Sequence, residues 1–216
     1  MAETESHSHT GRIEAFSDGV FAIAITLLII EIGVPEVHGG GDLTDKLTDL
    51  WPQYLAYVLS FFMIGIYWAN HHALFRLFHS TDHYFLMLNI FFLMAVAFLP
   101  FPTAVVGEYL KDSVHRDDAV HFYALGLILP AMGWVSLWMY ARYRGLLDPD
   151  LDPKYCDFLT RQYLFSQVPY WSALAVSFVY AWAAMAIIIG MAFLYTLPPR
   201  RPRYLSDQNY PPNVDD

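Results

Sequence analysis

Residues 12–32 read RIEAFSDGVFAIAITLLIIEI, a stretch long enough to cross a membrane as a helix. A helix rises ~1.5 Å per residue, so about 20 residues cross the ~30 Å hydrocarbon core of a bilayer. The stretch nevertheless carries Arg12, Glu14, Ser17 and Asp18 in its first two turns. An ionisable side chain inside a membrane costs on the order of 2.5–3.5 kcal/mol. We therefore expect Asp18 to face protein or water and not lipid.

Turned as a helix at roughly 100° per residue, the stretch has two different sides. One side is apolar: Gly19, Ile23 and Ile30 lie within about 40° of one another, and Thr26 and Leu27 flank them. Asp18 points roughly 140° away from Ile23. The pattern predicts one apolar face and, near the N-terminal end, a carboxylate that requires a partner on a neighbouring helix.

The composition of the chain is that of an integral membrane protein. Hydrophobic residues make up 56% and charged residues 15%, against roughly 25% charged in a soluble domain, and the mean hydropathy is +0.33. The net charge is −9, with the acids mostly in tails and loops and no basic stripe, so we expect no nucleic-acid partner. Cys156 is the only cysteine, which excludes an internal disulfide and multi-cysteine metal motifs.

Hydropathy predicts an all-α membrane protein with six transmembrane helices. After the first span come spans at about 51–68, 84–106 and 119–140, and two more within 163–197 that join near Tyr180. Pro100 and Pro102 should bend or interrupt the third span. We expect three regions: a disordered cytoplasmic N-terminus at 1–11, a six-helix transmembrane channel domain at 12–197, and a disordered cytoplasmic tail at 198–216.

The distribution of positive charge supports an even number of spans. With six spans and a cytoplasmic N-terminus, nine basic residues fall on the inner side: Arg12, Arg76, Arg142, Arg144, Lys154, Arg161, Arg200, Arg201 and Arg203. Three fall on the outer side: Lys46, Lys111 and Arg116. This asymmetry agrees with the positive-inside rule, and it predicts a multi-pass protein of the cell membrane with both termini in the cytoplasm.

Four groups of residues resemble a known family. Arg12-x-x-x-Phe16-Ser17-Asp18-Gly19 is similar to the RxxxFSDG signature that opens the first helix in the transmembrane protein 175 family of potassium channels. The resemblance continues in Trp68-x-x-His71, the helix with Asn89, and Pro100-Phe101-Pro102. It covers about the first half of the chain, and the second half contributes hydropathy only.

The resemblance implies a homotetramer in which the first helix of each subunit lines a central pore for K⁺, with no further cofactor. The family has no TVGYG filter, and none occurs here. The narrowest layers of its prokaryotic members are apolar rings, which fall on Ile23, Leu27 and Ile30, and a Ser/Thr layer associated with potassium preference falls on Thr26. Two other interpretations stay open, because such a stripe is ordinarily helix packing and Thr26 could instead bond to the carbonyl of Ala22.

The other motif residues are expected to form a structural network and not an ion-binding filter. We expect Asp18 to bind the imidazole of His71 and the amide of Asn89 and so to hold the first helix at a fixed tilt. Arg12, Phe16, Ser17 and Gly19 complete this motif network. The alternative is that His71 and Asn89 are satisfied core residues without a gating role.

The sequence therefore predicts a potassium-selective channel, K⁺ over Na⁺, with a hydrophobic constriction that gates by dewetting. A secondary transporter or a proton-conducting leak pathway in the same membrane remains the alternative, although no second copy of the first-helix motif is found. We expect no enzyme, since GxSxG and HExxH are absent. His71, His72, His79 and His83 lack the spacing of a zinc site, so no metal site is expected.

Overall fold

The computed structural model describes residues 3–36, 42–197 and 202–205, and the extended regular elements in these ranges are all α-helices. They are α1 (Glu3–Ile30), α2 (Leu43–Asp49), α3 (Trp51–Phe75), α4 (His83–Phe98), α5 (Pro100–Tyr109), α6 (Arg116–Arg144), α7 (Pro153–Phe165), α8 (Gln167–Ser177) and α9 (Ala181–Tyr195). The predicted all-α class is confirmed.

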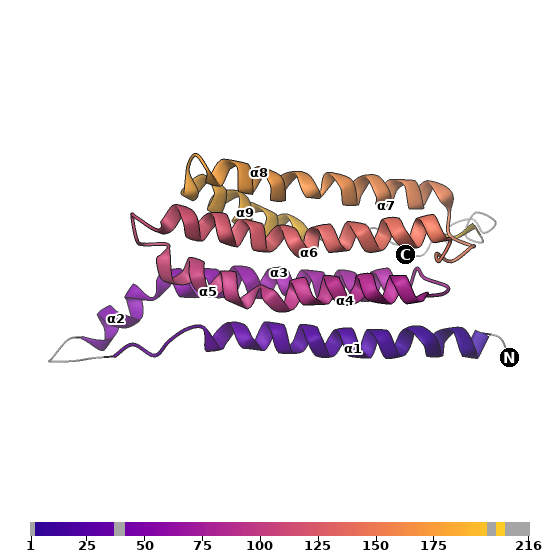
Figure 1. Ribbon diagram of the computed structural model, residues 1–216, viewed down its shortest axis with the longest axis horizontal. Helices are drawn as coiled ribbons and strands as arrows, with labels where there is room; N and C mark the ends of the chain where they lie inside the picture. The colour runs from indigo at the N-terminus through magenta and orange to yellow at the C-terminus, as the bar shows by residue number, and fades with distance from the viewer. Residues whose placement is uncertain (1–2, 37–41, 198–201, 206–216) are drawn as a thin grey trace, which may run out of the picture.

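The helices lie roughly along one axis and stack in layers (Figure 1). α1 forms one edge, α3 with α4 and α5 forms the next layer, α6 follows, and α7, α8 and α9 form the opposite edge. The largest fully buried side chains include Trp138 and Tyr123 of α6, Phe75 of α3, and Phe85 and Phe92 of α4. The core therefore sits around α6 and its contacts with the layers on both sides.

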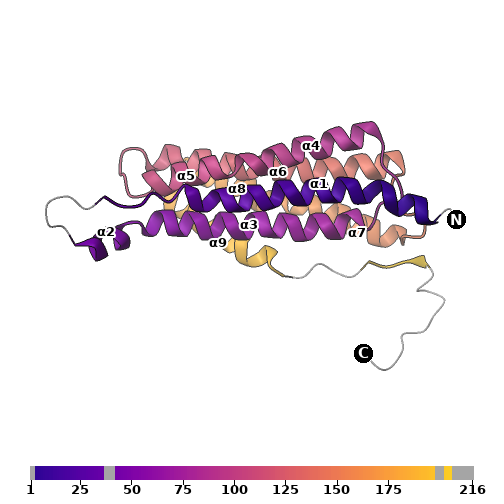
Figure 2. The ribbon, with the colours of Figure 1, turned by 90° about the horizontal axis from the view of Figure 1, so that it is seen from below.

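α1 is held to the bundle along a single narrow face. Ser17, Phe21, Ala24 and Leu28 are each at most 2% exposed, and their spacing of three or four residues places them on one side of the helix. Seen from below, α1 lies over the seam between α3 and α4 (Figure 2). The helix begins at Glu3, earlier than the predicted start at Arg12, and its apolar membrane-length part runs from Gly11 to Ile30.

Three described helical stretches are long and apolar enough to cross a membrane: Gly11–Ile30, His83–Tyr109 and Arg116–Arg144. A fourth arises if α2 and α3, which meet at an angle of 45°, are taken as one span. α9 is apolar but only 15 residues long. Length and composition thus establish several membrane-length helices, and the count of six spans stays a prediction.

The prolines of the third span interrupt the helix, but the chain continues in nearly the same direction, and His83–Tyr109 is one membrane-length stretch. α4 ends at Phe98 and α5 begins at Pro100, while Leu99 between them keeps helical dihedral angles of −56° and −34°. Proline has no backbone N–H, so a helical hydrogen bond is lost at each ring. The N–H of Thr103 bonds to the carbonyl of Leu99 at 3.1 Å and resumes the helix. The predicted interruption is confirmed.

The boundaries of the last three helices agree only in part with the prediction from hydropathy. The predicted join near Tyr180 is confirmed, because α8 ends at Ser177, α9 begins at Ala181 and Tyr180 between them is extended. The preceding helical path, however, begins at Pro153 and not near Tyr163: α7 and α8 are separated only by Ser166. Hydropathy alone did not give this start, because α7 combines buried Tyr155, Cys156 and Leu159 with exposed charged residues and is not uniformly apolar.

A short part of the C-terminal tail pairs with the loop before α7. The N–H of Asp152 bonds to the carbonyl of Arg203 at 3.0 Å, and the N–H of Leu205 bonds to the carbonyl of Asp150 at 2.8 Å. Leu151 and Tyr204 form an antiparallel bridge. Arg203, Tyr204 and Leu205 belong to the region 198–216 for which the sequence predicts disorder. Residues 198–201 and 206–216 of that region lie outside the described residues.

Candidate functional site

The side of α1 turned away from the bundle is apolar and uncovered within one chain. Ile23 is 62% exposed, Leu27 is 40% exposed and Ile30 is 71% exposed. Gly19 lies on the same exposed side. An isoleucine or leucine stripe that served packing inside the subunit would be buried, so within a single chain this stripe has another use, facing either lipid or further copies of the chain.

Thr26 lies on the exposed side of α1, and its hydroxyl is bound to the backbone of its own helix. Its Oγ1 donates to the carbonyl of Ala22 at 2.9 Å and is equally close to the carbonyl of Ile23. The bond to Ala22 that the sequence left open is thus present. Because the hydroxyl hydrogen is directed at the backbone, the oxygen lone pairs remain available on the outer side.

Three polar side chains from three helices form a buried chain beneath that face. Asn89 of α4 donates from Nδ2 to Oγ of Ser17 in α1 at 3.1 Å. Its Oδ1 pairs with Nε2 of His71 in α3 at 3.0 Å. An amide oxygen only accepts, so His71 carries its proton on Nε2 and donates. All three residues are at most 1% exposed, which makes this network a fixed connection between α1, α3 and α4.

Aromatic rings enclose His71 in the same place. Its imidazole stacks on Phe75 at a centroid distance of 4.2 Å and lies nearly parallel to Phe92 at 5.9 Å. The ring of Phe21 meets it edge-on at 5.5 Å. Because Phe21 belongs to α1 and Phe92 to α4, the same helices that share the hydrogen bonds also share this aromatic packing. The imidazole therefore has one fixed orientation.

Asp18 has a different partner from the one predicted. Its Oδ1 accepts a hydrogen bond from the indole Nε1 of Trp68 at 2.9 Å, on the surface between α1 and α3. The predicted bonds of Asp18 to His71 and Asn89 are wrong, since those two residues bind each other and Ser17. Neighbouring residues of a helix point about 100° apart, so only one of Ser17 and Asp18 can enter the α1–α4 contact.

Trp68 donates the hydrogen bond to Asp18, a role that the sequence analysis did not predict for it. It lies three residues before His71, on the adjacent turn of α3, and an indole N–H can only donate. Those two facts were sufficient to propose it as a partner for an exposed carboxylate. One turn further along α3, Nδ1 of His72 lies 3.8 Å from the carboxylate of Glu14 in α1, which is an ion pair when the imidazole is protonated.

The remaining motif residues lie outside the buried network. Arg12, Phe16 and Gly19 are exposed on α1, and Phe16 is 58% exposed. The motif therefore serves two sides of the helix: Ser17 faces the bundle, and the others face outward or toward the surface contact with α3. Among the residues that the structure describes, no group of three His, Cys, Asp or Glu side chains could hold a metal ion.

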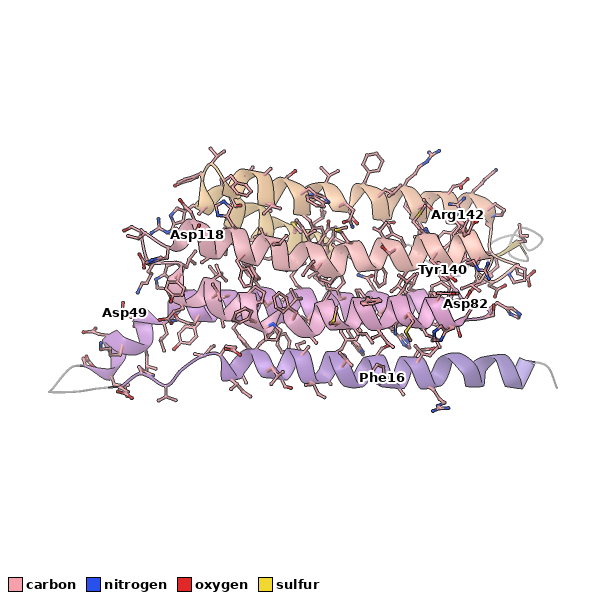
Figure 3. The ribbon with its side chains drawn as sticks, in the orientation of Figure 1. Phe16, Asp49, Asp82, Asp118, Tyr140 and Arg142 are labelled. Carbon is pink, nitrogen blue, oxygen red and sulfur yellow. The ribbon has the colours of Figure 1, made fainter. Side chains whose placement is uncertain are left out.

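A second polar cluster fixes the start of α4, the helix that carries Asn89. Asp82 caps this helix by accepting from the N–H of Phe85 at 2.8 Å. Its carboxylate also accepts from the hydroxyl of Tyr140 in α6 (Figure 3). It lies 3.4 Å from the guanidinium of Arg144 in the same helix. The backbone hydrogen bond from Phe85, with help from Tyr140 and Arg144, holds the pKa of Asp82 below its ordinary value.

The chain is similar to known proteins over nearly its whole length. The sequence profile described as "Endosomal/lysosomal potassium channel TMEM175" matches residues 12–100. A protein of Chamaesiphon minutus named as a potassium channel is 43% identical over 201 residues, which are 91% of this chain and 98% of that protein. A Gallus gallus protein named "Endosomal/lysosomal proton channel TMEM175" is 33% identical over 60% of this chain and 28% of its own length.

A solved structure agrees with the architecture as well as the sequence. The crystal structure described as a lysosomal potassium-selective channel TMEM175 homolog from Chamaesiphon minutus superimposes with a TM-score of 0.78. The match has 41% sequence identity and covers 88% of this chain and 97% of the other. Sequence identity over 91% of this chain and a shared helical architecture lead to the same conclusion as the motif on α1: the chain belongs to the TMEM175 family of potassium channels.

Proposed function

We propose that this protein is a homotetrameric potassium channel, selective for K⁺ over Na⁺, in which α1 of each subunit faces a central pore. The observation that carries the proposal is the exposed apolar face of α1, which lies roughly 120° around the helix from its buried face. A single such face encloses nothing, but copies arranged around a symmetry axis form a closed ring. α1 also lies at one edge of the bundle, where further copies have access to it (Figure 1).

The constriction is assigned to rings of Ile23, Leu27 and Ile30. A narrow apolar ring excludes water and ions, and a small widening lets water return, so such rings gate by dewetting. Their exposed side chains within one chain support this assignment. Thr26 lies beside them, and its oxygen lone pairs supply a polar layer to an ion that has lost part of its hydration shell.

The buried network of Ser17, Asn89 and His71 is assigned a supporting role. It fixes the rotation of α1 about its own axis, and that rotation decides which side chains face the pore. The rest of the motif is assigned to the surface of α1. Asp18 bonds to Trp68 of α3, and the exposed Arg12, Phe16 and Gly19 are assigned to contacts with neighbouring subunits.

The proposed topology has six spans, with the channel domain at 12–197 and both termini in the cytoplasm of a cell whose plasma membrane holds the protein. α3, the α4–α5 pair, α6, the α7–α8 pair and α9 supply the five spans after α1. The excess of basic residues on the inner side supports this orientation. The lipid bilayer and the other subunits are the partners, and the permeant ion takes the place of any cofactor.

Flux measurements on reconstituted protein test the proposal. Vesicles containing the protein should pass K⁺ faster than Na⁺ down equal gradients. Ile23→Asn should lower the K⁺-to-Na⁺ flux ratio toward one, because a polar ring stays wet. Ile29→Asn is the matched control: Ile29 is also exposed on α1 but points roughly 120° away from Ile23, so its change should leave the ratio intact. Equal effects of the two substitutions would remove Ile23 from the constriction.

Proton conduction is the second candidate, favoured by the vertebrate relatives that are named proton channels. The same vesicles, loaded with a pH-sensitive dye, separate the two candidates. A proton flux that persists without K⁺, and that is lost when the ring of Ile23 side chains is made narrower, would assign protons to the same pore. Flux that saturates at low ion concentration would instead indicate a transporter.

A further inference from the structure

A cavity of about 490 Å³ lies inside the subunit, away from α1. Its walls come from α3, α6, the α7–α8 pair and the end of α9, and they include Ile66, Trp134, Phe158 and Tyr170. Binding sites for small molecules typically measure about 300–1,000 Å³ and are mostly apolar with a few polar groups. The cavity fits that description, and none of the described residues that line it is charged.

Two polar side chains at this cavity bond to backbone carbonyls. Nε2 of Gln167 donates to the carbonyl of Ala131 at 3.1 Å, and the hydroxyl of Tyr195 donates to the carbonyl of Ser166 at 2.8 Å. These bonds hold the polar wall in place. The bond from Nε2 also fixes the plane of the Gln167 amide and therefore the position of its oxygen.

Two buried hydrogen-bonding atoms of α8 at the cavity, one acceptor oxygen and one hydroxyl hydrogen, have no partner among the described residues. Oε1 of Gln167 is buried and receives no hydrogen bond. The hydroxyl of Tyr67 donates to that of Tyr170 at 3.0 Å, which leaves the hydrogen of Tyr170 without an acceptor. Gln167 and Tyr170 are three residues apart on α8 and so lie on the same face of the helix. One acceptor and one donor side by side match a hydroxyl group, which both donates and accepts.

The short last helix leaves this cavity open toward the bilayer. α9 has 15 residues and spans about 22 Å, less than the ~30 Å hydrocarbon core. It ends part of the way along the bundle (Figure 1), and Leu194 and Leu197 at its end line the cavity and are more than half exposed. Phe165 on the other rim is 72% exposed. An apolar rim of this kind admits a hydrocarbon chain from lipid and not an ion from water.

We propose that the cavity binds a neutral, long-chain amphipathic molecule from the membrane through its hydroxyl head group. The head lies between Gln167 and Tyr170, and the hydrocarbon chain fills the apolar part and leaves by the rim at the end of α9. The uncharged walls disfavour a phospholipid phosphate or an ionised fatty acid, whose charge would lose its hydration without a paired cation. This site is independent of the proposed pore.

Photolabelling of the full-length protein with a diazirine derivative of dodecanol tests the site. Peptides from α7, α8 and the end of α9 should carry the label, and dodecanol should compete for it while dodecane, which has no hydroxyl, should compete far less. Gln167→Met should weaken competition by dodecanol about tenfold, the effect of one hydrogen bond. Gln162→Met is the matched control, since Gln162 lines the same cavity without carrying the buried acceptor, and it should behave as the parent.

A second variant keeps the test decisive if Gln167→Met does not fold. Ile66→Trp adds bulk to a half-buried wall residue and should abolish labelling while the protein keeps its parent elution volume and melting temperature. Absence of label from the wild-type cavity would overturn the proposal. So would equal competition by dodecane and dodecanol.

Discussion

At the level of single residues, Asn89 is the middle member of the buried network that connects three helices. It is the only member of the buried network with both a donor and an acceptor in use, toward Ser17 on one side and His71 on the other. A hydroxyl, an amide and an imidazole in this order connect α1 to α4 and α3. Removing the middle group leaves both outer groups buried and unpaired.

We expect Asn89→Ala to lower the stability of the folded protein in detergent. Hydrogen bonds between helices in a membrane average about 0.6 kcal/mol and reach about 1.7 kcal/mol, so the two lost bonds cost about 1–3 kcal/mol. Thermal unfolding followed by tryptophan fluorescence measures the loss. Asn70→Ala is the matched control, because Asn70 lies half-buried at a cavity wall on α3. If both variants melt at the same temperature, the network does not hold α1.

The sequence predicted where this network lies but named Asp18 as the member from α1, where the structure has Ser17. His71 and Asn89 were predicted to meet near the first helix, and they do. On an ideal helix Ser17 lies roughly 120° to one side of Ile23 and Asp18 roughly 140° to the other, so both are turned away from the exposed face. Periodicity alone cannot decide which of them α4 contacts. That choice depends on how the helices pack, which the structure supplies.

At the scale of helices, Asp82 joins the start of α4 to the end of α6. It caps α4 and receives the hydroxyl of Tyr140 and the guanidinium of Arg144 from α6. Figure 3 shows Asp82 and Tyr140 at the same end of the bundle as Arg142, which bonds to α7. This end therefore carries polar contacts that link α4, α6 and the beginning of α7.

The lowered pKa of Asp82 predicts how stability depends on pH. A carboxyl group with a lower pKa in the folded than in the unfolded state stabilises the fold above its unfolded pKa of about 3.9. That contribution is lost as the pH falls through the folded pKa. Asp82→Asn should melt below the parent at neutral pH, and the difference should shrink below about pH 4. A difference that is the same at both pH values would show that the charge of Asp82 does not contribute.

Hydropathy located the uniformly apolar helices well and the mixed ones poorly. The breaks at Pro100 and near Tyr180 follow from local chemistry, because proline removes a donor and the extended residue at 180 begins a new helix. α7 escaped a hydropathy argument because only one side of it is buried, through Tyr155, Cys156 and Leu159. An amphipathic helix of this kind is recognised by its period of 3.6 residues and not by its mean hydropathy.

At the scale of the whole molecule, α1 is attached by a narrow buried face and presents its other sides outward. The resemblance of the motif suggested where copies of α1 meet, but a single sequence contains no direct record of the symmetry that brings them together. Within one chain, a helix facing lipid and a helix facing an axis look alike. The difference lies in which exposed side meets another subunit, and that can be measured.

Cysteine cross-linking tests the axial position of α1 in the assembled protein. Cys156 is the only native cysteine, so Cys156→Ser gives a background without thiols. A disulfide forms only where Cα atoms come within about 7 Å of each other, a separation that subunits reach close to a narrow axis. In this background Ile23→Cys should yield oxidation-dependent dimers in detergent, from a particle whose mass equals four subunits. Ile29→Cys, on the same helix but turned toward another side, should yield far fewer. Monomeric protein, or equal cross-linking at the two positions, would indicate that Ile23 faces lipid and would contradict the proposed central pore.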